Sequence, residues 1–138
     1  MPKERMKRPD FSDSYQIINV IFAAVILMIF FYSGLFRAEE NYPISSQYMI
    51  ITGEETPSTG LSRAFSEMVR LNFQKAKAYN ESSPEVFGFF FLQLLLRIVL
   101  FFLYNRTENK KLMIRFDAAG SAILFLLCFR DFIFPMYS

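Results

Sequence analysis

The sequence predicts an all-α membrane protein with three transmembrane helices and a short amphipathic helical hairpin in the outer loop between spans one and two. Hydrophobic residues make up 53% of the 138-residue chain and include 18 Phe, which is too apolar for a soluble domain of this size. We expect a single membrane domain over 1–138. Three apolar runs have the length of a membrane span: 14–36, 86–104 and 118–136.

The first span is uncharged from Ser14 to Phe36. A basic tail precedes it, containing Lys3, Arg5, Lys7 and Arg8. The apolar run is too long for the core of a signal peptide, and no small-residue cleavage site follows it. We therefore expect this segment to be an uncleaved signal anchor.

The outer loop, 37–85, contains a turn-rich segment, 54–60, followed by an amphipathic pattern. Apolar residues of the next segment share one helical face: Leu61, Ala64, Phe65, Met68 and Val69. Asn72 is placed to cap a second short helix over 73–79. We expect the two helices to form a hairpin at the outer membrane surface.

The same loop carries a sequence pattern with an ordered set of matching residues: Thr52-Gly53, Pro57, Gly60 to Phe65, Asn72-Phe73, Ala76 and Tyr79-Asn80. Over 42–104 the chain resembles the domain-of-unknown-function 2752 family of small bacterial membrane proteins. That family has a Cys-Pro-x-Cys-Gly-x-Thr-Arg signature, where this chain has Thr56 and Thr59 instead of the cysteines. The resemblance implies a membrane scaffold and supplies no established activity.

The second span contains Arg97 near its centre, with Gln93 one turn away on the same face. A charge at this depth costs roughly 3 kcal/mol on insertion scales, so it persists where it has a partner or a role. Three interpretations stay open: an internal pair with Asp131, a pair with a carboxylate of another subunit, and a transport or proton path.

The third span opens with small residues, Ala118 to Ala122, which allow close helix approach. Arg130 and Asp131 lie near its end, either in the outer interfacial zone or as a second ion-pair contact across a complex. In the outer loop, Arg63 either bonds loop carbonyls from the first turn of its helix or contacts an anion or lipid headgroup.

Orientation follows from the distribution of basic residues. The N-terminal tail and the short connection 105–117 each carry four Lys or Arg, whereas the long outer loop has five against seven Glu. We expect the N-terminus and 105–117 to be cytoplasmic and the C-terminus to be periplasmic or external. The expected location is the bacterial inner (cytoplasmic) membrane, with a multi-pass topology.

The composition argues against several function classes. The chain has no His, and its only cysteine, Cys128, lies in an apolar run. A net charge of +2 gives no reason to expect a nucleic-acid partner. No phosphate loop, nucleophile elbow or metal-ligand constellation is present. We therefore expect no catalytic residue, no cofactor and no metal, and a protein that is not an enzyme.

These features lead to one expected function and one alternative. We expect an accessory or structural subunit of a larger membrane protein complex, with other membrane protein subunits and the lipid bilayer as partners. The contacts are assigned to Arg97, Gln93, Arg130, Asp131 and Arg63. The alternative is an oligomeric channel or transporter component, formed as a homo-oligomer, with Arg97 in the path.

Overall fold

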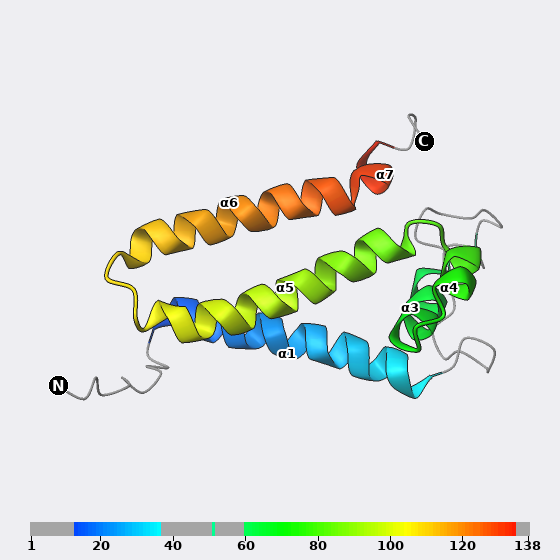
Figure 1. Ribbon diagram of the computed structural model, residues 1–138, viewed down its shortest axis with the longest axis horizontal. Helices are drawn as coiled ribbons and strands as arrows, with labels where there is room; N and C mark the ends of the chain where they lie inside the picture. The colour runs from blue at the N-terminus through cyan, green and yellow to red at the C-terminus, as the bar shows by residue number, and fades with distance from the viewer. Residues whose placement is uncertain (1–12, 37–50, 52–59, 135–138) are drawn as a thin grey trace.

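The computed structural model describes residues 13–36, 51 and 60–134 (Figure 1). These residues form helices and no strand, which confirms the predicted all-α class. Two helices are long and apolar enough to cross a membrane: α1 (Ser14–Leu35) and α5 (Ser83–Tyr104). Several sequence features lie outside the described residues: the basic N-terminal tail, Thr52-Gly53, Thr56, Pro57, Thr59 and the C-terminal 135–138.

Helix α1 begins at an Asp13 cap, whose carboxylate accepts a hydrogen bond from the Tyr15 backbone N–H at 3.1 Å. Its buried stripe is mostly polar and consists of Gln16, Asn19, Ile26 and Ser33. The large apolar side chains on its other faces are exposed. A helix with polar groups inside and apolar groups outside is suited to a lipid environment.

Helix α5 runs antiparallel to α1 and packs against it (Figure 1). It starts at Ser83, three residues before the predicted start, because Pro84 fits the first helical turn, where a backbone N–H is not needed. The buried face of α5 includes Gln93 and Arg97 together with Leu94, Leu100 and Tyr104. Both predicted polar residues of the second span therefore point into the helix bundle.

Two short helices, α3 (Leu61–Val69) and α4 (Phe73–Tyr79), pack together near the C-terminal end of α1 (Figure 1). Their core is formed by Ala64, Met68 and Ala76. Gly60 precedes α3 at φ 77°, and an added Cβ there would collide with the carbonyl of Tyr79. The turn into α3 therefore requires glycine.

Helix α3 ends in a Schellman motif. The N–H of Leu71 donates to the carbonyl of Met68 at 3.0 Å, and the N–H of Asn72 donates to that of Glu67 at 2.9 Å. Leu71 takes the left-handed position at φ 63°, where glycine is usual. The expected side-chain cap by Asn72 is wrong: its amide reaches back to the Glu67 carboxylate at 2.9 Å.

Helix α6 (Lys110–Cys128) begins eight residues before the predicted start of the third span, so 110–117 is helix rather than loop. The Asn109 side chain accepts from the Leu112 N–H at 3.2 Å and caps this earlier start. The helix breaks at Phe129 and continues as the short α7 (Arg130–Ile133). Helix α6 is not apolar enough over the length of a membrane span to be a candidate span, because its first two turns contain four charged residues: Lys110, Lys111, Arg115 and Asp117.

Helix α5 lies between α1 and α6, and α6 runs antiparallel to it (Figure 1). One contact zone between α5 and α6 is aromatic: the Phe89 ring lies 5.9 Å from Phe125 and 5.2 Å from Phe129. The other zone is polar and contains Asp117, the only buried residue of α6. The fold thus holds its third long helix at two separate places.

Candidate functional site

The polar zone is centred on an ion pair between Arg97 and Asp117. Nη1 of Arg97 donates to Oδ2 of Asp117 and Nη2 donates to Oδ1, each at 2.7 Å. Arg97 is 7% exposed and Asp117 8% exposed. This bidentate geometry matches the planar guanidinium to the planar carboxylate and is among the strongest polar contacts in proteins.

The guanidinium of Arg97 also donates to one neutral acceptor from each long helix. Nη1 reaches Oδ1 of Asn19 on α1 at 2.8 Å. Nη2 reaches Oε1 of Gln93 on α5 at 3.1 Å and Oγ of Ser121 on α6 at 2.9 Å. One buried side chain thereby connects α1, α5 and α6.

Asp117 also accepts hydrogen bonds from two hydroxyl groups. The Tyr15 hydroxyl donates to Oδ2 at 2.6 Å, and the Ser121 hydroxyl donates to Oδ1 at 3.2 Å. A carboxylate bonded to a cation and two hydroxyls is stabilised as an anion. The cluster of Asn19, Gln93, Arg97, Asp117 and Ser121, which we name the Arg97 cluster, therefore holds its charges as a neutral pair.

A second polar group lies at the end of the bundle nearest the α5–α6 connection. The Tyr104 hydroxyl donates to Oδ2 of Asp13 at 2.7 Å. Lys110 lies 3.8 Å from the same carboxylate oxygen and 4.6 Å above the Tyr104 ring. The Tyr15 ring lies 4.8 Å from that of Tyr104 and links this group to the Arg97 cluster.

Hydrogen-bonding capacity is left over inside the Arg97 cluster. A guanidinium only donates, so the amide oxygens of Asn19 and Gln93 must face it and their NH₂ groups must turn away. Neither amide nitrogen has a hydrogen-bond partner among the described residues. Buried donors of this kind cost about 1–3 kcal/mol each, which offsets part of the stabilisation that the cluster provides.

The chemistry available to this cluster is limited. The described residues contain no group of three or more His, Cys, Asp or Glu that could hold a metal ion. The only carboxylate of the cluster, Asp117, is occupied by Arg97 and two hydroxyls. The arrangement is suited to fixing helices relative to one another, because every contact joins side chains of different helices or of successive turns.

Of the three interpretations left open for Arg97, an internal pair is present, but its carboxylate is Asp117 and not Asp131. Asp131 lies on α7 beside Arg130, and the Nε of Arg130 is 3.4 Å from its Oδ1. Both side chains are substantially exposed, so this neighbour pair contributes little. The sequence pattern does not single out Asp117, because this residue falls in the connection 105–117 before the expected third span. Its spacing of four residues from Ser121 was the available signal, since it places both on one helical face.

Arg70 has a structural role that the sequence did not reveal. Its guanidinium donates to carbonyls at the end of α1: Ser33 at 3.4 Å, Gly34 at 2.8 Å and Phe36 at 3.4 Å. Ser66 also contacts both Arg70 and the Phe36 carbonyl. The last carbonyls of a helix have no partner within it, so Arg70 caps α1 from α3.

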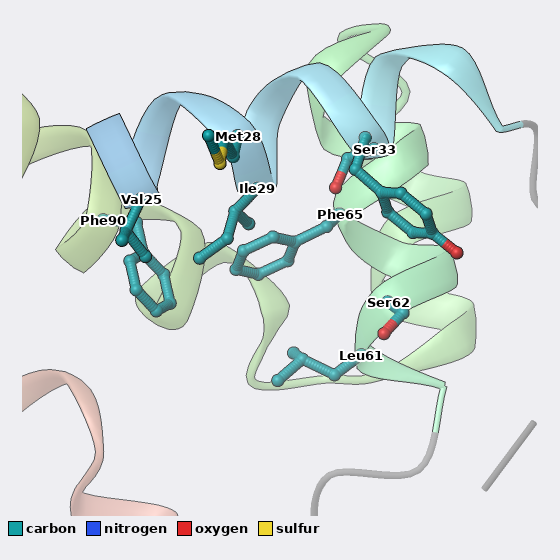
Figure 2. Close-up of a pocket in the computed structure, with 9 residues that line it drawn as sticks. Val25, Met28, Ile29, Ser33, Leu61, Ser62, Phe65 and Phe90 are labelled. Carbon is teal, nitrogen blue, oxygen red and sulfur yellow. The ribbon is translucent and has the colours of Figure 1, made fainter. Parts of the chain in front are cut away.

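Arg63, the residue singled out for this region, is exposed on α3 and has no partner shown among the described residues. An apolar pocket of about 410 Å³ lies nearby, between α1, α3 and α5. Figure 2 shows Ile29 and Phe65 turned toward each other across it, with Leu61 and Ser62 at its edge. No charged side chain lines this pocket, so nothing in its lining orients a charged ligand.

Comparison with known proteins finds no matching family model, no matching curated protein and no matching solved structure.

Proposed function

We propose that the chain is a three-span accessory or structural subunit of a larger membrane protein complex in the bacterial inner membrane. In this proposal α6 and α7 form the third span. The connection after α5 faces the cytoplasm, since four basic residues are gathered in it and in the first two turns of α6: Arg106, Lys110, Lys111 and Arg115. The resemblance to the domain-of-unknown-function 2752 family is part of the same proposal and rests on the matching residues alone.

The observation that carries this proposal is the surface of α6. Every residue of α6 except Asp117 is at least partly exposed. The helical spacing puts Ala118, Ala119 and Ala122 on a face turned away from Asp117, and all three are exposed. Small residues let two membrane helices approach closely. A partner helix packed on this face would complete the burial of α6.

The Arg97 cluster has a different role in this proposal from the one that its sequence suggested. Because Asp117 neutralises Arg97 within the chain, no partner carboxylate is needed. The cluster then serves to hold the α6 surface in place for a partner. The same neutralisation argues against the channel alternative, since an anion-selective path needs a cation that is not already paired.

The test is purification from native membranes in mild detergent, with Ala122→Phe as the variant and Ala24→Phe as its control. Ala24 is also an exposed helical alanine, but it lies on α1. We expect native mass spectrometry to find one hetero-complex of fixed stoichiometry for the parent and A24F, and its loss in A122F. A chain that purifies alone or only as a homo-oligomer contradicts the proposal.

A further inference from the structure

We propose that the groove between α5 and α6 binds an anionic phospholipid of the bilayer, with an acyl chain along the groove and the phosphate at the α5–α6 connection. The inference rests on the proposed membrane placement of the chain. It adds a specific lipid ligand to the groove, to which the Arg97 cluster contributes one lining residue, Asp117.

The groove has the shape and lining that an acyl chain needs. Its volume is about 420 Å³, and it is lined by Leu96, Leu100, Thr107, Asn109, Leu112, Met113, Phe116, Asp117 and Gly120. The apolar members come from both helices, and Gly120 has open space where a side chain would begin. Phe116 is 70% exposed at the groove and is available to cover a bound chain.

The polar end of the groove lies at the connection between the two helices, where Thr107 and Asn109 line it. Four basic residues occur in this connection and the first two turns of α6: Arg106, Lys110, Lys111 and Arg115. The same stretch has two acidic residues, Glu108 and the buried Asp117, which is paired with Arg97. All four basic residues are exposed. None of the four lines the groove itself, but Arg106 and Lys110 are the chain neighbours of Thr107 and Asn109, which do. Basic groups at one end of a groove between membrane helices are suited to an anionic headgroup.

The buried carboxylate in the groove does not oppose this ligand. Asp117 lines the groove, but both of its oxygens are bonded to Arg97. Its charge is therefore balanced before any phosphate arrives. Of the four basic residues, Lys110 is partly engaged with Asp13 at 3.8 Å, so Arg106 and Lys111 are the better choice for a test.

The apolar walls and the basic end together favour a phospholipid over a second protein chain. A helix of a partner would need both a matching apolar face along the whole groove and an acidic residue placed at the basic end. A phospholipid has both parts in one molecule, and its headgroup and chains are already at the depths that the proposed topology gives to the two ends of the groove.

The natural absence of Trp from the chain makes a direct test practical. A single reporter, Phe116→Trp, is placed in the groove and reconstituted in phosphatidylcholine vesicles that contain a minor fraction of brominated lipid. Bromine on an acyl chain quenches a tryptophan that it contacts. The measurement compares brominated phosphatidylglycerol with brominated phosphatidylcholine at the same fraction.

We expect phosphatidylglycerol to quench several-fold more effectively at the same fraction. Adding Arg106→Gln and Lys111→Gln should lower this preference. The upper limit for each removed cation is about five-fold. The control with Arg63→Gln and Arg130→Gln removes as much charge elsewhere and should keep the preference. Gly120→Leu should block the groove and reduce quenching, whereas Gly88→Leu, with equally open space at its Cβ, should not.

Two negative results separate the lipid site from the proposed function. Equal quenching by the two brominated lipids in the parent reporter overturns the lipid site, as does an equal loss of preference in the control variant. Failure of the reporter to float with vesicles, with no quenching by either lipid, overturns the membrane placement itself and the lipid site with it.

Discussion

Arg97 and Asp117 lie at the same distance from the connection between their helices. Arg97 is seven residues before Tyr104, the last residue of α5, and Asp117 is seven residues after Lys110, the first of α6 (104 − 97 and 117 − 110). At 1.5 Å per residue each lies about 10 Å from its helix end. Equal depth on antiparallel neighbours is what allows their two 2.7 Å bonds to form side by side.

Breaking this pair from one side should be costly, and removing both charges should not. Asp117→Leu leaves Arg97 buried without its counter-charge, so we expect a loss of about 3–5 kcal/mol in the free energy of unfolding. The double variant Arg97→Leu with Asp117→Leu should recover most of that loss. Unfolding by SDS titration in mixed micelles measures both. Equal stability of the single and double variants contradicts the coupling.

Replacing Arg70 should weaken the attachment of α3 to α1. Arg70→Met removes donors from three carbonyls at the end of α1, and we expect a loss of about 1–3 kcal/mol with faster amide exchange near Gly34. Arg63→Met changes an exposed arginine on the same helix and serves as the control. Similar effects of the two substitutions rule out a specific cap at Arg70.

Two glycine substitutions should have opposite signs. Gly60→Ala forces a left-handed alanine against the Tyr79 carbonyl, so we expect a loss of at least about 1–2 kcal/mol. Gly88→Ala adds a methyl group in open space within α5, and we expect a gain of about 0.5–1 kcal/mol from helix propensity. Thermal unfolding of the purified variants measures the sign of both stability changes. A G60A variant as stable as the parent would exclude strain at the turn.

Leu71 has a left-handed backbone conformation and is 73% exposed, so burial of its side chain adds little to the stability of the isolated chain. We expect Leu71→Gly to stabilise the protein by about 1 kcal/mol in detergent, because glycine removes the left-handed cost. Leu95→Gly, at an exposed position in mid-α5, should lose about 1 kcal/mol instead. Destabilisation by L71G would show that Leu71 makes a contact worth more than its strain.

The helices were the most predictable part of the molecule. The first and second spans were expected at 14–36 and 86–104, and α1 and α5 occupy Ser14–Leu35 and Ser83–Tyr104. Long apolar runs bounded by polar residues allow few alternatives, so their positions follow from composition. Gln93 and Arg97 were correctly placed on one face, because four residues make about one helical turn.

The partners of those residues were less predictable. A charge marks the end of an apolar run, so the sequence pattern predicts Asp117 in the loop and the start of the third span after it. Once Arg97 neutralises it, the same aspartate becomes compatible with a helix interior. Likewise Arg70 does not differ from Arg63 by any local pattern, and only the folded arrangement brings it to the end of α1.

The bond between Arg97 and Asp117 also sets a condition on how the polypeptide is made. Helix α5 leaves the ribosome before α6, and at that moment its arginine has no acid to neutralise it. Entry of α5 into lipid at this stage costs the full transfer free energy of an isolated cation. Entry after α6 has been synthesised costs less, because Arg97 and Asp117 then enter together as a neutral ion pair. On the proposed three-span topology, insertion of α5 should therefore wait for α6, so that the translocation machinery releases the two as a joint, electrically neutral hairpin.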